Sequence, residues 1–288
     1  MNDYVIFTDS ACDINDALLQ KWGVKYVSLT FSSENTSGSF ANDNLSIKDF
    51  YNKMREGEQF RTAAANIEDF KSAFRNDLTN GKDILYLGFS SGISTTYNSA
   101  RIAANELLSE FPDRLIICID SLSASAGFGL LLYLTVNKKL GGATIEEAAE
   151  FAKNNRLNIG HWFTVDDLTY LKRGGRISPA VAFVGGVLGI KPVLHVDNEG
   201  RLVNVTKARG RRAALAALAD KYSELATDPS QGTVFISHGD CREDAEYLKN
   251  IIKERHGVNV KLITDIGPII GSHSGPGTVA LFFVCKKR

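Results

Sequence analysis

The first half of the chain alternates short apolar runs with apolar residues at helical spacing. The clearest helical repeat comprises Ile67, Phe70, Phe74 and Leu78, with Asn66 placed to cap its start. Strands that alternate with helices are typical of a parallel sheet covered on both faces, so we expect an α/β unit here. The apolar runs of strand length cover residues 4–7, 26–31, 84–88 and 115–119.

Two further helices are expected in this half. One begins near Ser94, and its apolar face comprises Tyr97, Ala100, Ala104 and Leu108. The other opens on a capping box formed by Thr144 and Glu147 and runs to about Arg156.

The second half shows more strand signals in succession. Apolar runs at residues 193–196 and 202–205 flank the turn sequence Asp197-Asn-Glu-Gly200, which predicts a β-hairpin. Strands are also expected at residues 233–237, 260–263 and 279–284, and helices at 211–226 and 242–256. This mixture predicts an α+β domain with a largely antiparallel sheet. We place the boundary between Arg156 and Ile159, which gives domains at residues 1–157 and 158–288.

Composition and charge narrow the classes of function. A chain of 288 residues is long enough for two domains. The 33 lysines and arginines balance 33 aspartates and glutamates, for a formal net charge of zero. Because a nucleic-acid-binding protein usually carries a basic excess, we expect no nucleic-acid partner.

The cysteines and apolar stretches indicate a cytoplasmic protein. Cys12, Cys118, Cys241 and Cys285 are far apart and form no Cys-x-x-Cys motif, so we expect reduced thiols, no metal site and no redox motif. The apolar run near the N-terminus is too short for a signal peptide. The longest apolar stretches, residues 124–134 and 180–190, are shorter than the ~20 residues of a membrane span.

The first candidate polar cluster is Phe7-Thr-Asp-Ser-Ala-Cys-Asp13, at the end of the first expected strand. Ligands of parallel α/β sheets gather at this edge. The alternative is that Asp9, Ser10 and Asp13 only satisfy the turn and cap the next helix.

The second cluster is Gly88-Phe-Ser-Ser-Gly-Ile-Ser-Thr-Thr-Tyr97, where a strand runs into a helix. Ser94 is expected at the helix N-terminus, where free N–H groups and the helix dipole favour an anion. Gly92 would let the backbone approach a ligand. The alternative is an ordinary serine or threonine cap.

The third cluster is Ile266-Gly-Pro-Ile-Ile-Gly-Ser-His-Ser-Gly-Pro-Gly277, which we interpret as a rigid, tightly turned loop with His273 at its centre. A fourth feature is cationic: Arg173 and Arg176 lie in one basic segment, and Lys207 and Arg209 in another. Such residues either form a solvated face or dock a phosphate or an acidic protein.

Taken together and in this order, the motifs resemble the DegV family of bacterial fatty-acid-binding proteins, over essentially the whole chain. The matching segments are Thr8-Asp-Ser10, Ser91-Gly-Ile-Ser-Thr-Thr-Tyr97, Leu171-Lys-Arg-Gly-Gly-Arg-Ile-Ser178, Ile190-Lys-Pro-Val-Leu194, Lys207-Ala-Arg-Gly210 and Ile270-Gly-Ser-His-Ser-Gly-Pro-Gly277. The resemblance implies two domains with a fatty acid in the cleft between them. It also implies a separate fatty acid kinase, which phosphorylates the bound acid to an acyl phosphate for phospholipid synthesis.

The resemblance also implies site residues. The carboxylate would bind at Thr62, Gly92, Ile93, Ser94 and His273. On electrostatic grounds we expect Arg173, Arg176, Lys207 and Arg209 to form a positive rim that docks the kinase, if their two segments lie together. In place of the family's Thr-Ser-x-Pro-Ser, this chain has Thr62-Ala-Ala-Ala-Asn66, which keeps the threonine and changes the loop behind it.

An apolar pocket would hold the acyl chain. Residues 180–190 would form either a wall of that pocket or an ordinary core helix, and the pocket residues we expect are Phe163, Phe183, Val187, Leu188 and Ile269.

The predicted protein is therefore a monomeric carrier and not an enzyme. It would have a fatty acid ligand, no other cofactor, and at most transient membrane contact. The alternative is an acyl hydrolase that uses Ser94 and His273, although the chain has no Gly-x-Ser-x-Gly elbow.

Overall fold

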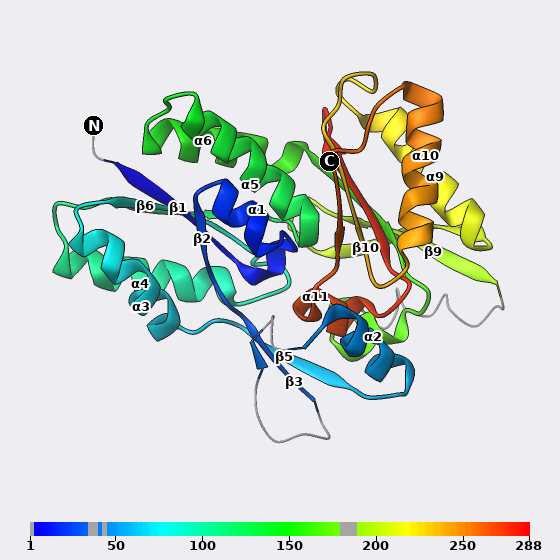
Figure 1. Ribbon diagram of the computed structural model, residues 1–288, viewed down its shortest axis with the longest axis horizontal. Helices are drawn as coiled ribbons and strands as arrows, with labels where there is room; N and C mark the ends of the chain where they lie inside the picture. The colour runs from blue at the N-terminus through cyan, green and yellow to red at the C-terminus, as the bar shows by residue number, and fades with distance from the viewer. Residues whose placement is uncertain (1–2, 34–39, 42–44, 179–188) are drawn as a thin grey trace.

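The computed structural model describes residues 3–33, 40–41, 45–178 and 189–288 (Figure 1). The N-terminal half is built on a four-stranded parallel sheet in the order β2-β1-β6-β7. Every residue of β1 and β6 is buried, as expected where helices cover both faces of a parallel sheet. The strands are β1 (Tyr4–Asp9), β2 (Val24–Val27), β6 (Asp83–Gly88) and β7 (Ile116–Asp120).

Helices cover both faces of this sheet (Figure 1). They are α3 (Ile67–Thr79) and α4 (Thr96–Glu110) on one face, and α1 (Asp16–Lys21), α5 (Ser125–Leu140) and α6 (Ile145–Asn155) on the other. The predicted caps of α3 and α6 are confirmed, since Asn66 and Thr144 both form capping boxes. Helix α4, however, begins at Thr96 and not at Ser94, because the serine-rich sequence before it first makes a turn.

A small antiparallel sheet, which the sequence did not predict, follows β2. It has the order β4-β3-β5 and carries α2 on it. Its elements are β3 (Thr30–Ser33), β4 (Phe40–Ala41), α2 (Ile47–Arg55) and β5 (Phe60–Ala63). The single strand expected over residues 26–31 is therefore wrong: the chain leaves the parallel sheet after Val27 and enters a different sheet at Thr30. A continuous apolar run does not reveal such a bend.

The C-terminal half is built on a six-stranded sheet in the order β10-β9-β8-β13-β11-β12. All neighbouring strands are antiparallel except β11 and β12, so the predicted fold class is confirmed. The predicted hairpin is confirmed as β9 and β10. The strands are β8 (Ile159–Thr164), β9 (Ile190–Val196), β10 (Leu202–Arg209), β11 (Val234–His238), β12 (Leu262–Asp265) and β13 (Val279–Val284).

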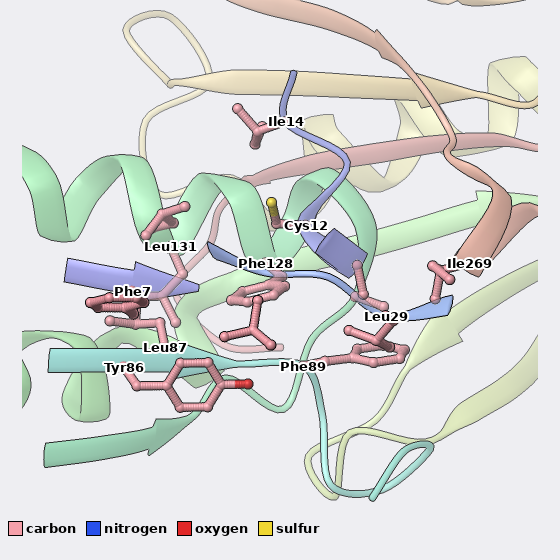
Figure 2. Close-up of a cluster of buried hydrophobic side chains, with 14 of the residues drawn as sticks. Phe7, Cys12, Ile14, Leu29, Tyr86, Leu87, Phe89, Phe128, Leu131 and Ile269 are labelled. Carbon is pink, nitrogen blue, oxygen red and sulfur yellow. The ribbon is translucent and has the colours of Figure 1, made fainter. Parts of the chain in front are cut away.

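Helix α5 lies between the two large sheets (Figure 1). Two of its glycines allow close packing: an added Cβ at Gly127 would lie 2.5 Å from Phe282 of β13, and one at Gly129 would lie 2.6 Å from Ile14. One hydrophobic cluster runs from the parallel sheet through α5 to the inner face of the six-stranded sheet, with Phe128 and Leu131 beside Phe7 and Leu87 (Figure 2).

A second hydrophobic cluster fills the space under α9 (Arg211–Leu225) and α10 (Arg242–His256), on the outer face of the six-stranded sheet. The chain passes from the parallel sheet to the six-stranded sheet between β7 and β8, and the short 3₁₀ turn at Arg156–Asn158 directly precedes β8. Because the first cluster is shared by both halves, the domain boundary at residue 157 stays a prediction.

Candidate functional site

A cavity of about 790 Å³ lies where the two halves of the protein meet. Its volume falls within the range typical of small-molecule sites, roughly 300–1,000 Å³. Its apolar wall includes Leu29, Phe89, Phe163, Leu171, Ile177 and Ile269. The same cavity is lined by all five residues expected at the carboxylate: Thr62, Gly92, Ile93, Ser94 and His273. These residues come from three distant parts of the sequence.

Thr62 and His273 form a hydrogen-bonded pair at the cavity wall. Thr62 Oγ1 of β5 lies 2.8 Å from His273 Nε2. The expected loop around His273 is wrong, because His273 lies in the last turn of a helix, α11 (Pro268–Ser274). Proline at the first helical position favours this start. Gly271 allows α11 to approach Tyr51 of α2, whose hydroxyl oxygen would lie 2.6 Å from an added Cβ.

His273 is held on its other side by the basic segment. A Cβ added at Gly174 would lie 2.1 Å from His273 Nδ1, so only glycine fits there. Burial, and secondarily the charge of Arg176, lowers the pKa of His273 to about 4. The imidazole is therefore neutral at physiological pH, with one nitrogen a hydrogen-bond donor and the other an acceptor.

The segment 89–95, which we call the serine loop, follows β6 and carries Ser94. Ser94 Oγ lies 2.9 Å from Thr96 Oγ1 and accepts a hydrogen bond from Thr96 N–H at 3.2 Å. The N–H groups of Ile93 and Ser94 both donate to Ser90 C=O, at 3.3 and 3.1 Å. In this structure the turn itself uses these two N–H groups, and their role toward a carboxylate stays a prediction.

Glycine is required at position 92 because another part of the protein packs against it. A Cβ added there would lie 2.4 Å from the carbonyl oxygen of Glu199, at the tip of the β9–β10 hairpin. Ser90 Oγ donates to Gly200 C=O at 2.9 Å in the same contact. The hairpin of the C-terminal half thus fixes the serine loop of the N-terminal half.

The four basic residues expected on one rim have different environments. Arg176 is partly buried and lines the cavity, and its Nε donates to Ile93 C=O at 3.2 Å. Burial lowers its pKa from the ordinary value. Arg173, Lys207 and Arg209 are exposed, with the Arg173 guanidinium 5.7 Å from the ring centre of Tyr170. Sequence reasoning missed that Arg176 belongs to the cavity, because adjacent cations look alike in a basic segment.

Comparison with known proteins identifies the family and the fold. The model of the family described as "Uncharacterised protein, DegV family" matches residues 3–286. The chain belongs to the DegV family. It is 42% identical over 285 residues to a DegV domain-containing protein of Clostridium perfringens, covering 99% of this chain and 98% of that protein. It is 31% identical to a Thermotoga maritima protein named "Fatty acid-binding protein", covering 95% of each.

Solved structures of DegV proteins share this fold. A DegV family protein from Eubacterium eligens loaded with heptadecanoic acid superposes with a TM-score of 0.87, at 26% identity, covering 98% of this chain and all of the other. The "Fatty Acid Kinase (Fak) B3 protein" of Streptococcus pneumoniae superposes with a TM-score of 0.86 at 22% identity, covering 99% of this chain and all of the other, a likeness of fold.

The predicted acyl pocket of this DegV protein is partly described. Phe163 of β8 and Ile269 of α11 line the cavity. Phe183, Val187 and Leu188 lie outside the described residues, as does most of the predicted wall at residues 180–190. Leu29 and Ile177 were missed as lining residues, because neither lies in a segment that sequence reasoning treated as apolar pocket wall.

The polar cluster after β1 is neither exposed nor part of the cavity lining. Asp9, Ser10 and Asp13 are all buried. The alternative interpretation is partly right, since Asp9 caps a 3₁₀ turn, η1 (Ser10–Cys12). The cap of α1, however, is Asn15.

Other kinds of site have less support in the described part of the chain. Ser94 and His273, the pair a hydrolase would need, have Thr96 and Thr62 as their hydrogen-bond partners. No group of three His, Cys, Asp or Glu side chains among the described residues is arranged to hold a metal ion. Within the same residues, no helix combines the length and apolar character required to cross a bilayer.

Proposed function

We propose that this DegV protein binds a long-chain fatty acid in the cavity and presents its carboxylate to a separate fatty acid kinase. The single observation that carries the proposal is the placement of Thr62, Ser94 and His273, far apart in sequence, around one largely apolar cavity. The names of the Thermotoga relative and of the loaded Eubacterium structure support the same ligand class. We call Thr62, Ser94 and His273 the carboxylate site.

The carboxylate site offers hydrogen-bond donors to an anion. The Thr62 and Ser94 hydroxyls each donate one hydrogen bond to the anion, and neutral His273 orients Thr62 by donating its Nε2–H to Thr62 Oγ1. The Arg176 guanidinium lies close enough to depress the pKa of His273, so it also compensates the charge of a carboxylate placed there. Without such partners a carboxylate in an apolar cavity is very costly.

Burial of the acyl chain supplies most of the affinity. Each methylene removed from water contributes about 0.8 kcal/mol, before the cost of ordering the chain is subtracted. In this proposal the protein itself performs no chemistry and needs no cofactor. It acts as a monomeric carrier, and the kinase transfers the phosphoryl group to the carboxylate.

Lipid extraction tests the ligand. Protein purified from a heterologous host and extracted with organic solvent should release about one long-chain fatty acid per chain, measured by mass spectrometry. Delipidated protein should then rebind a fatty acid in titration calorimetry. The proposal fails if no acid is extracted and none rebinds. An ester-cleavage assay on the same preparation distinguishes a carrier from the acyl hydrolase alternative.

The kinase partner rests on the family resemblance and on the exposed basic residues. A carrier whose carboxylate meets ATP brings two anions together, and exposed cations near the opening would reduce their repulsion. Arg173, Lys207 and Arg209 are available for this, because all three side chains are exposed.

A further inference from the structure

The turn at residues 9–13, which we call the β1 turn, lies at the centre of the molecule. It follows β1 and packs among Phe128, Leu29 and Ile14, as Figure 2 shows around Cys12. Asp9 is fully buried and Asp13 is 7% exposed. Asp13 also has a left-handed backbone, with φ of 51°. A buried aspartate in that conformation is held by its surroundings.

Asp9 connects the β1 turn to the serine loop. Its carboxylate accepts three hydrogen bonds: from Ala11 N–H at 3.1 Å, from Tyr86 O–H at 2.7 Å and from Phe89 N–H at 2.9 Å. Phe89 is the first residue of the serine loop and itself lines the cavity. The position of the loop that carries Ser94 therefore depends on this carboxylate.

Ser10 connects the β1 turn to the strands that carry Thr62. Its Oγ accepts a hydrogen bond from Leu29 N–H at 2.9 Å. Leu29 lies in the bend where the chain leaves the parallel sheet and begins β3. In the next sheet, Phe31 of β3 pairs with Thr62 of β5. Ser10 is only 7% exposed, so water does not readily take the place of this acceptor.

Asp13 connects the β1 turn to the helix that carries His273. One carboxyl oxygen accepts from Gly267 N–H at 2.9 Å, at the start of α11, and the other is hydrogen-bonded to Ser125 Oγ at 2.5 Å. The backbone oxygen of Asp13 accepts from Thr264 O–H at 2.9 Å. A seven-residue helix has little stability of its own, so such contacts fix its place.

We propose that Asp9, Ser10 and Asp13 are positioning residues for the carboxylate site. Each holds the element that carries one of its members: Asp9 the serine loop with Ser94, Ser10 the strands with Thr62, and Asp13 the helix with His273. One five-residue turn thus sets the spacing of three donors from separate parts of the chain. This inference rests on the proposed function, because it assigns these roles toward the fatty acid carboxylate.

The two aspartates differ in what can replace them. Asp9 faces three donors, so the amide NH₂ of an asparagine would meet at least one of them. At Asp13, an asparagine would accept from Gly267 N–H and donate to Ser125 Oγ. Ser125 could then donate to Ser237 Oγ, 2.9 Å away. Asp13→Asn should therefore keep the network that Asp9→Asn breaks.

The test compares hexadecanoic acid with its methyl ester. Both bury the same chain, and only the acid presents a carboxylate, so the ratio of the two dissociation constants reports the carboxylate site separately from the rest of the fold. Asp9→Asn, Ser10→Ala and Asp13→Ala should each weaken acid binding about tenfold while the ester constant changes by less than about twofold. Asp13→Asn should retain the wild-type ratio. The matched control is Asp16→Asn, an exposed aspartate at the start of α1.

Each outcome decides one question. A wild-type protein that binds acid and ester equally would overturn the proposed function itself. If the wild type prefers the acid, and folded Asp9→Asn and Ser10→Ala keep that preference, the positioning role is wrong and the carrier function stands. Circular dichroism and thermal melting establish folding. If Asp9→Asn does not fold, Tyr86→Phe and Ser10→Ala take its place, since Tyr86→Phe removes one hydrogen-bond donor to Asp9. The ratio of the acid and ester dissociation constants then decides the question for these variants.

Discussion

Arg173 and Arg176 lie three positions apart in one basic segment, and the structure gives them opposite environments. Arg176 is partly buried at the cavity, bonded to Ile93 C=O and close to His273. Arg173 is exposed, like Lys207 and Arg209. We call these last three the outer cations. Residues at the cavity act through particular hydrogen bonds, whereas the outer cations act only through a field that water and salt weaken.

This contrast predicts where single substitutions have large effects. At the cavity, each lost partner leaves another buried group unsatisfied, which costs about 1–3 kcal/mol. On the surface, a single charge contributes about 1 kcal/mol or less.

The largest effect is expected at the carboxylate site. Thr62→Val keeps the shape of the side chain and removes the hydroxyl that lies 2.8 Å from His273. Loss of a hydrogen bond to a charged group should cost about 1.5–3 kcal/mol, roughly 10- to 100-fold in the dissociation constant for a fatty acid. Titration calorimetry measures the effect, and Ser94→Ala and His273→Ala should also weaken binding.

Thr206→Val, at an exposed position of β10, is the matched control for Thr62→Val and should bind fatty acid as the wild type does. If Thr62→Val, Ser94→Ala and His273→Ala all bind with wild-type affinity, these residues do not form the carboxylate site.

An intermediate effect is expected in the pH dependence of stability. Burial raises the pKa of Asp13 from 3.8 to about 8. Between these values the unfolded chain has lost the proton and the folded protein keeps it, so the free energy of unfolding falls as pH rises through this window. Asp13→Asn cannot ionise and removes that loss. The variant should therefore gain stability relative to wild type as pH increases from about 4 to 8.

Denaturant unfolding at several pH values measures this difference. His161, whose pKa burial lowers to about 3, has the opposite effect: its contribution is lost as pH falls below about 6.5. His161 is present in both proteins, so its contribution to the free energy of unfolding cancels in the comparison. A stability difference between wild type and Asp13→Asn that is flat with pH would contradict the prediction.

The smallest effect on lipid binding is expected at the outer cations. Arg209→Glu should leave fatty-acid affinity within about twofold of wild type, because the residue is exposed. If the outer cations dock the kinase, the same variant should lower kinase-dependent acyl phosphate formation. This loss should shrink as ionic strength rises. Lipid binding and coupled phosphorylation are measured on one preparation at low and moderate salt.

Lys138→Glu is the control for this charge reversal. Lys138 is exposed in the last turn of α5, at the opposite end of that helix from Ser125, which lines the cavity. Arg173→Glu should behave like Arg209→Glu. Normal phosphorylation by both variants would assign these arginines to an ordinary solvated face.

Much of the fold could be predicted because its signals are local. The caps Asn66 and Thr144 were predicted from a few neighbouring residues, and so was the hairpin around Asp197-Asn-Glu-Gly200. The bend before Thr30 was missed because its cause, the hydrogen bond from Leu29 to Ser10, spans 19 residues. The helix around His273 was missed because its glycines suggested a loop, although Gly271 serves close packing on Tyr51.

The amino-acid sequence alone was enough to predict the alternation of strands and helices in the first half and the antiparallel pattern of the second. Periodicity, caps and turns depend on neighbours within a few positions, so these features can be read directly. Only the tertiary structure decided which cation faces the cavity and that Gly92 and Gly174 serve contacts with the protein itself. It also decided that Asp9, Ser10 and Asp13 join three separate elements, because hydrogen bonds between residues distant in sequence exist only once the chain has folded.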